Sequence, residues 1–494
     1  EIRYSGKPAA FLRAFKASYF AILYNFIVMG WVINAMASVV SVMLNMDKWT
    51  AVWLCVIIAL VYAILSGFWG VVITDLVQFV IAMFGSISLA IIALNYVGGM
   101  ESLLEKLSNL VDTGIAHENT IRFIPPIPDQ SIAEISFWES PFSKFLIFIS
   151  IMWWSHHGTD GGGYIIQRMS SAKNEKHALL ATLWFNLAHY ALRVWPWIIV
   201  SVVSIVLFPI IPEAYSELGT KAGYPLVMNS LLGPGMKGIL IVSFLAAFMS
   251  TIDTHLNWGA SYLINDIYKR FFKPEASEKH YVLVGKLLTI ILMVLAAFTS
   301  LKMQSISKAW EFIFSMGAGI GLVLILRWFW WRINAWTEIT ALSVSIITTT
   351  TLEIIAAYQT ITSGSEYTLF GNSPVLFGIP LQIHHKLLII VPLSIISWLI
   401  MTFITDPEPD EKLEEFYKRI QPGGWWGPIT KNFQHTMQPV SEGFLIQWIS
   451  GALMIYGFTF GIGNLIFMNY SSSILCFGCA SIGSYMVWKR GISK

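Results

Sequence analysis

Hydrophobic residues in this chain form long runs that shorter polar segments separate. A helix needs about 20 mostly apolar residues to cross a bilayer, so runs of this length predict membrane spans. The expected spans are 14–44, 49–66, 70–96, 141–158, 178–209, 236–265, 281–301, 305–327, 334–358, 384–404, 443–467 and 470–488. The pattern therefore predicts an all-α polytopic membrane protein with about 12 transmembrane helices.

Basic residues are concentrated in alternate loops between these runs. The clusters are Arg3, Lys7, Arg13 and Lys16; Arg168, Lys173 and Lys176; Lys269, Arg270 and Lys273; Arg327 and Arg332; Lys412, Lys418 and Arg419; and Lys489, Arg490 and Lys494. Loop 97–140 is instead rich in Asp and Glu. Because basic loops stay in the cytoplasm, we expect a multi-pass protein of the cell inner or plasma membrane with both ends of this chain cytoplasmic.

Two loops are expected to contain short helices. Residues 100–112 read as an amphipathic helix at the membrane surface. The stretch that begins at Asp406 has acidic residues first and basic residues last, which favours a helix because these charges complement the helix dipole.

The composition agrees with a membrane protein. The chain is 55% hydrophobic and 12% charged, whereas soluble domains carry about 25% charged residues. The net charge of +2 gives no indication of nucleic-acid binding. Cys476 and Cys479 form a C-x-x-C pair, but an apolar helix surrounds them, so we assign them to packing.

A cluster of hydroxyl and carboxyl groups interrupts the apolar run at 241–268. Ala247, Ser250, Thr251 and Thr254 share one helical stripe, with Asp253 and Asn257 to one side of it. A carboxylate within a membrane helix costs about 2.5–3.5 kcal/mol and calls for a functional explanation. Hard oxygen ligands on one face suit Na⁺, although a polar packing stripe between helices is the alternative interpretation.

Three segments together resemble the sodium:solute symporter family. They are Ser66–Gln78 (SGFWGVVITDLVQ), Tyr164–Arg168 with Ser171–Lys173, and Ala247–Thr254 (AFMSTIDT) continuing to Asn265–Tyr268. They occur in the family's order, and the resemblance covers nearly the whole chain. It implies an inverted-repeat fold of five plus five helices, with discontinuous helices around a site at the midplane.

The resemblance also implies an order of helices. The first helix here matches the third core helix of the family, so about 1–330 would hold partial core repeats and about 331–494 additional C-terminal helices, all in a single transmembrane domain over 1–494. The family's first core helices would then precede Glu1, and we expect the sequence to be part of a longer protein.

Sodium ligands follow from the third motif. The resemblance assigns the Ala247 carbonyl and the Ser250 and Thr251 hydroxyls to the sodium site, completed by carbonyls of the first core helix. Asp75, with Asp253 and Thr254, would form a second sodium site or line the exit path. An acid favourably placed at the start of a helix is the alternative for Asp75.

Solute ligands are expected where the sixth core helix breaks. Three glycines, 161–163, follow a polar run and favour unwinding. Trp153 or Trp154 would stack on the solute, and Ser155, His156, Thr159 or Asp160 would hydrogen-bond it. Glu311, near the outer part of the tenth core helix, would add a polar contact. The alternatives are a cytoplasmic helix end with lipid-anchored Trp residues, and a solvated helix end for Glu311.

These observations predict a Na⁺-coupled symporter of a small organic solute, sugar or amino-acid-like, which works by alternating access. The expected partners are Na⁺, the solute and the lipid bilayer; Na⁺ acts as the coupling ion, and no cofactor and no nucleic acid is expected. Proton coupling on the same fold, and a transporter-derived membrane sensor, remain as alternatives. No catalytic motif points to an enzyme.

Overall fold

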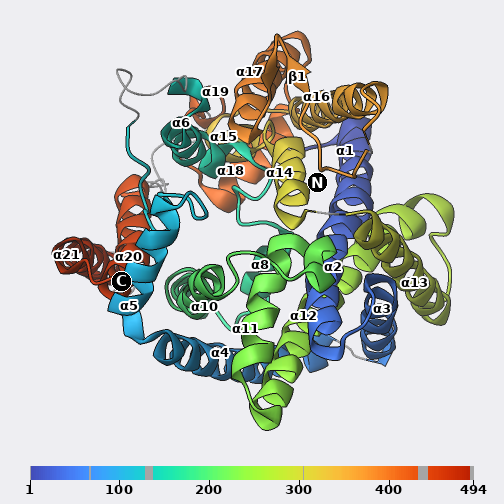
Figure 1. The fold of residues 1–494 in the computed structure, drawn as a ribbon. Helices are drawn as coiled ribbons and strands as arrows, with labels where there is room; N and C mark the ends of the chain where they lie inside the picture. The colour runs from blue at the N-terminus through green and yellow to red at the C-terminus, as the bar shows by residue number, and fades with distance from the viewer. Residues whose placement is uncertain are drawn as a thin grey trace. The chain divides into compact units, whose positions relative to one another are not determined.

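The computed structural model describes residues 2–65, 68–127, 137–303, 305–365, 367–431 and 443–489, except for the side chains of 64, 65, 68–75, 164 and 444. These residues are mostly helical (Figure 1). The chain divides into two compact units, each built from segments that are distant in sequence: 1–31, 124–164 and 255–442 in unit 1, and 32–123, 165–254 and 443–494 in unit 2.

Unit 1 begins with α1 and the start of α2 and contains the long helices α13, α16 and α17. Its elements are α1 (Gly6–Ser18), η1 (Tyr19–Tyr24), η2 (Phe137–Glu139), α6 (Pro141–Ile147), η3 (Phe148–Met152), α7 (Trp153–Ser155), η6 (Leu263–Phe272), α13 (Glu278–Lys302), α14 (Ile306–Gly317), α15 (Gly321–Phe329), α16 (Ala335–Thr362), β1 (Val375–Leu376), β2 (Ile379–Pro380), α17 (Ile383–Ile404), α18 (Asp410–Ile420) and α19 (Gly427–Thr430).

Unit 2 contains most of α2 and α12 and the last two helices. Its elements are α2 (Asn25–Leu44), α3 (Lys48–Leu65), α4 (Phe68–Val97), α5 (Gly99–Asp112), α8 (Gly163–Ser170), α9 (Glu175–Asn186), η4 (Leu187–Leu192), α10 (Val194–Leu207), η5 (Glu213–Ala222), α11 (Gly223–Leu231), α12 (Pro234–Tyr262), α20 (Phe444–Ile466) and α21 (Tyr470–Val487). The unit boundary falls within α2, α8 and α12.

Each of the twelve expected spans contains helix in the structure. Within the described residues, nine helical segments are long and apolar enough to cross a membrane. The exceptions are α3, whose described side chains cover only Lys48–Ala63, α21, and the stretch at 141–158, where helix ends at Ser155. The loop helices are confirmed as α5 and α18, and the only strand pair in the described chain is the β1–β2 hairpin.

Polar residues fix where several helices begin. The side chains of Asn174, Ser277 and Ser305 accept hydrogen bonds from the backbone N–H groups at the starts of α9, α13 and α14. Asn334 and Thr337 form a capping box at the start of α16. Such caps satisfy N–H groups that the helix leaves unpaired and contribute about 1 kcal/mol each.

Each unit has its own apolar core. In unit 1, α1, α14 and α16 bury Leu12, Met316 and Leu342 together. In unit 2, the α5 residues Leu103 and Leu107, one helical turn apart, are buried against residues of α4 and α10. The amphipathic pattern of 100–112 thus serves to pack this helix on its own unit.

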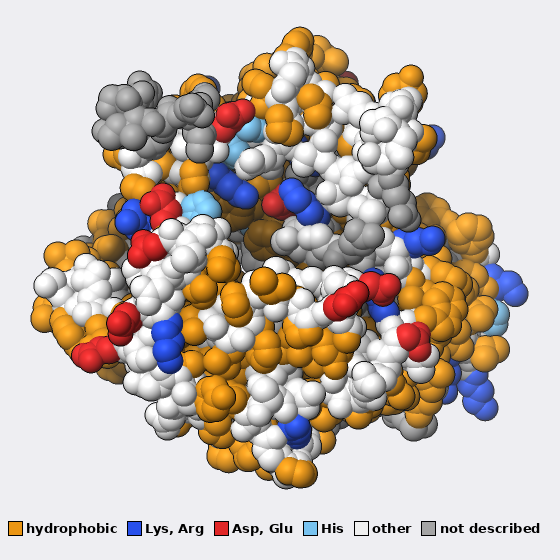
Figure 2. Space-filling view, in the orientation of Figure 1, with side chains coloured by type: hydrophobic (Ala, Val, Ile, Leu, Met, Phe, Trp, Pro, Cys, Tyr) orange, Lys and Arg blue, Asp and Glu red, His pale blue; other side chains and the backbone are white. Residues whose placement is uncertain are grey.

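Apolar side chains also cover outward faces. On α13, Leu283, Leu287, Ile291 and Leu295 are exposed at helical spacing, and Figure 2 shows a largely apolar surface over this helix. A soluble protein rarely exposes a continuous patch of this kind. These faces are suited to contact lipid.

The C-terminal helices α20 and α21 lie side by side (Figure 1) and pack through small residues. A Cβ on Gly457 would approach the Ala480 nitrogen to 2.7 Å, and one on Gly483 would approach the Met454 nitrogen to 2.6 Å. Ser473 Oγ donates to the Gly461 carbonyl between the two helices. Close backbone approach at small residues is typical of membrane helix pairs.

Candidate functional site

The predicted sodium ligands lie within one turn of α12 in unit 2. Thr251 Oγ1 donates a hydrogen bond to the Ala247 carbonyl, with the two oxygens 3.0 Å apart. Ala247 is exposed, and Ser250 and Thr251 are partly exposed. Oxygens at this separation can contact one cation, since Ca²⁺, a hard ion, binds oxygens at about 2.3–2.6 Å. The Thr251 hydroxyl donates in this bond, so its oxygen keeps lone pairs for an ion.

The residues predicted for a second ion have a basic neighbour. Asp253 is buried, and Thr254 Oγ1 accepts a hydrogen bond from Arg168 Nη2 at 3.4 Å. This bond joins the second and third family motifs within unit 2. A guanidinium at Thr254 repels a cation placed on the same hydroxyl. Asp75 is part of α4, but its side chain lies outside the described residues.

The predicted helix break is present in unit 1. Helix ends at Ser155, and His156 has extended backbone angles. Gly161 and Gly162 adopt positive φ values of 100° and 70°, which glycine tolerates best. Helix resumes with α8 at Gly163. The three glycines thus give the expected interruption, which we call the 156–162 turn.

A second break, at 317–321 between α14 and α15, meets the first. The segment reads Gly-Ala-Gly-Ile-Gly. A Cβ on Gly317 would meet His157 Nδ1 at 2.1 Å, and one on Gly321 would meet the Trp154 carbonyl oxygen at 2.4 Å. Only glycine therefore lets the two breaks approach so closely.

The hydrophobic pattern of the sequence does not reveal this second break. Glycines inside an apolar run do not alter its hydrophobic character, so the run at 305–327 reads as one span. The alternate spacing of Gly317, Gly319 and Gly321 was the available signal. A Cβ on Gly319 would meet the hydroxyl oxygens of Ser345 at 2.0 Å and Ser394 at 2.2 Å.

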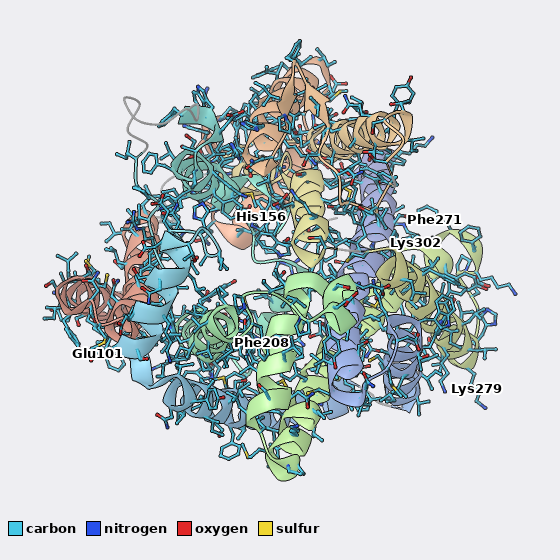
Figure 3. All side chains as sticks on the ribbon, viewed as in Figure 1. Glu101, His156, Phe208, Phe271, Lys279 and Lys302 are labelled. Carbon is cyan, nitrogen blue, oxygen red and sulfur yellow. The ribbon has the colours of Figure 1, made fainter. Side chains whose placement is uncertain are left out.

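The predicted solute ligands separate into two groups. Ser155 is fully buried at the first break. His156 is labelled in Figure 3; its ring packs on Phe314 of α14 with ring centroids 5.3 Å apart. Trp153 is 48% exposed, while Trp154 Nε1 donates to the Ser150 carbonyl at 2.7 Å. Ser155 and His156 thus lie at the meeting of the breaks, whereas Trp153 faces outward.

Glu311 belongs to the same α14 but pairs locally. Its Oε2 lies 3.1 Å from Lys308 Nζ, one helical turn away. No described contact joins Glu311 to Ser155 or His156. Its assignment as a solute ligand stays a prediction.

A charge cluster around the buried Glu338, which the sequence pattern does not reveal, lies beside the 156–162 turn. Arg327 Nη2 is 2.7 Å from Asp160 Oδ2, and Arg327 Nη1 is 3.3 Å from Glu338 Oε1. Lys16 Nζ pairs with Glu338 Oε2, and Tyr4 hydroxyl donates to Glu338 Oε1 at 2.6 Å. The negative charges of Asp160 and Glu338 balance the positive charges of Arg327 and Lys16.

Tyr4 stays a hydrogen-bond donor in this cluster. Burial, reinforced by the negative charge of Glu338, raises the pKa of Tyr4 well above its ordinary value. A protonated phenol next to a buried carboxylate satisfies one of its lone pairs.

Long apolar helices, two broken helical segments and apolar outward faces are together typical of the fold of a membrane transport protein. Comparison with known proteins agrees. The sodium:solute symporter family matches residues 1–347, so the chain belongs to this family.

Individual relatives are distant. Sodium/glucose cotransporter 1 of Oryctolagus cuniculus is 27% identical over 338 residues, which cover 63% of this chain and 50% of the relative. The osmoregulated proline transporter OpuE of Bacillus subtilis (strain 168) is 26% identical, over 61% of this chain and 56% of the relative. The chain thus spans about half the length of the curated relatives it matches.

A solved structure shares the fold. The substrate-bound, outward-open structure of a Na⁺-coupled sialic acid symporter aligns with a TM-score of 0.55 and 17% identity, over 82% of this chain and 76% of that chain. At this identity the likeness concerns the fold alone.

Proposed function

We propose that this protein carries a small organic solute across the membrane by coupling it to inward flow of Na⁺. The observation that supports this most is the pair of oxygens on Ala247 and Thr251, 3.0 Å apart on a membrane helix of a sodium:solute symporter. Ser250 adds a third oxygen on the same turn. A dehydrated Na⁺ needs more oxygens than these three, so a neighbouring segment completes the site.

The energetics suit this role. Moving one charge inward across about 100 mV releases about 2.3 kcal/mol. Coupling requires the ion to favour one of two conformations. An ion held between α12 and a neighbouring segment favours the state in which they lie together, and its release favours the other state.

The solute, sugar or amino-acid-like, binds in this proposal at the meeting of the two breaks. Ser155 and His156 offer polar groups there, while Trp153, Trp154 and Glu311 are the further ligands proposed from the sequence. Unwound segments at the midplane provide backbone groups for a polar solute. The rest of the proposal is an inverted-repeat fold with about 12 spans and cytoplasmic ends.

One Na⁺ site is better supported than two. The Arg168 guanidinium donates a hydrogen bond to the Thr254 hydroxyl, which disfavours a cation at the same oxygen. We therefore assign Asp75, Asp253 and Thr254 to the exit path in preference to a second site.

Uptake into proteoliposomes tests the proposal. A panel of radiolabelled sugars, amino acids and carboxylates is presented with a Na⁺ gradient, with choline replacing Na⁺ at fixed pH, and with a proton gradient alone. Uptake that requires Na⁺ is expected. Uptake driven by protons without Na⁺ would instead indicate proton coupling, and binding without flux would indicate a sensor.

A further inference from the structure

Asp160 is the ionic anchor of the 156–162 turn. Its Oδ2 pairs with Arg327 Nη2 at 2.7 Å, and its Oδ1 accepts a hydrogen bond from Gly162 N–H at 3.3 Å. The side chains are 16% exposed for Asp160 and 21% for Arg327. A pair this shielded is weakened less by water than a surface pair.

Arg327 is itself held in place. Its second nitrogen bonds to Glu338, whose side chain is fully buried and also receives Lys16 and Tyr4. The planar guanidinium can bond two carboxylates in fixed directions, which an ammonium cannot do. Through these two bonds, Arg327 connects Asp160 to Glu338 on α16 and so holds Asp160 in place.

Residues 158–162 otherwise have only short-range hydrogen bonds in the described chain, whereas the rings of His156 and His157 pack on Phe314 and on aromatic residues of η1. Thr159 N–H donates to the His156 carbonyl, Gly161 N–H donates to the Gly158 carbonyl, and Gly158 N–H donates to His156 Nδ1. These bonds shape the turn but connect it only to itself. Among the side-chain contacts described for residues 158–162, the Asp160–Arg327 pair is the one that reaches a distant element.

The position of this anchor along the chain is significant. Gly161–Gly163 follow Asp160, and the chain passes from unit 1 to unit 2 between Tyr164 and Ile165. Glycines permit large backbone changes at low cost. Asp160 thus lies between the segment that carries Ser155 and His156, which it holds in place, and the glycines at 161–163, whose backbone can change conformation.

We propose that Arg327 and Asp160 are positioning residues of the solute site: their ion pair fixes the turn that follows Ser155 and His156 while the glycines beyond it adapt. That these residues position a solute site rests on the proposed function. The anchoring itself is a property of the protein alone, so it can be measured without Na⁺ or solute.

The experiment is hydrogen–deuterium exchange of the purified protein, read on peptides that cover 156–163 and α14. Two variants separate charge from shape. Asp160→Asn keeps the shape and the acceptor for Gly162 but loses the charge, whereas Asp160→Glu keeps the charge and alters the shape. Glu415→Gln, which breaks the exposed Lys412–Glu415 pair of 2.8 Å on α18, is the matched control.

We expect exchange in 156–163 to rise about tenfold in Asp160→Asn, the equivalent of 1.4 kcal/mol, and less in Asp160→Glu. The α14 peptide, the melting temperature and the control should stay near wild type. The reverse order of the two variants, or unchanged exchange in Asp160→Asn, would overturn the inference. Neither result depends on Na⁺-driven uptake, whose absence from the wild type would instead count against the proposed function.

Discussion

Gly321 packs directly against the backbone of Ser155. A Cβ added to Gly321 would lie 2.4 Å from the Ser155 carbonyl carbon and 2.6 Å from the His156 carbonyl oxygen. These atoms belong to the backbone and cannot rotate away. The first residue of α15 therefore limits how closely the two helix breaks meet.

Gly321→Ala should accordingly destabilise the protein by about 1–3 kcal/mol, the usual effect of overpacking. Thermal unfolding in detergent measures the change. Gly478→Ala is the matched control, because no atom lies within 4 Å of a Cβ there on α21. It should be neutral or slightly stabilising. Equal effects from both substitutions would show that the close contact at Gly321 is not limiting.

Glu338→Gln should cost about 3–5 kcal/mol, because it leaves Lys16 and Arg327 partly buried without their shared carboxylate. Chemical unfolding at neutral pH measures the loss. The exposed pair tested by Glu415→Gln should change stability by less than about 1 kcal/mol. A loss at Glu338 no larger than at Glu415 would contradict the role assigned to the cluster.

Stability should depend on pH through Lys221. Burial, with repulsion from Lys48, lowers the pKa of Lys221 from 10.5 to about 8, while its Nζ donates to Asn34 Oδ1 at 3.1 Å. Below pH 8 the group is protonated in both the folded and the unfolded state, and folding carries the full cost of burying the charge. Between about 8 and 10.5 the unfolded state binds more protons, so the free energy of unfolding rises with pH.

Lys221→Met tests this dependence. The substitution should raise stability at pH 7 and flatten the rise in melting temperature between pH 8 and 10. A variant whose melting temperature follows the wild-type curve over this range would assign the dependence to another group.

Thr254→Val should leave the apparent Na⁺ affinity within about twofold of wild type, since the hydroxyl is engaged by Arg168. Na⁺ titration of uptake, including its Hill coefficient, measures the effect. A clear fall in affinity or in the Hill coefficient would restore Thr254 to a second sodium site.

Much of the helical fold could be predicted because lipid imposes strong rules on sequence. Backbone polar groups must be satisfied within the membrane, so apolar runs become helices, and all twelve runs contain helix. Three consecutive glycines also indicated the break after Ser155. The N-caps at Ser277 and Asn334 follow equally local rules.

Contacts between distant residues could not be read in this way. Lys16 and Glu338 are 322 positions apart, and Asp160 and Arg327 are 167 apart. Single charges near the ends of membrane spans are common, so nothing in the sequence marks these residues as partners. The same limit applies to Gly321, whose role depends on a backbone segment far away in sequence.

The central claim is that oxygens on one turn of α12 bind Na⁺, and ²²Na⁺ binding to the purified full-length protein tests it most directly. Thr251→Val is compared with Thr289→Val on α13, whose hydroxyl makes the same bond, at 3.0 Å, to the carbonyl four residues earlier. Ser250→Ala is compared with Ser397→Ala, since Ser397 is a partly exposed serine of α17 that also bonds the carbonyl four residues earlier. We predict that both α12 substitutions weaken Na⁺ binding by about tenfold or more while both controls bind as wild type. Unchanged Na⁺ binding in Thr251→Val and Ser250→Ala would contradict the account.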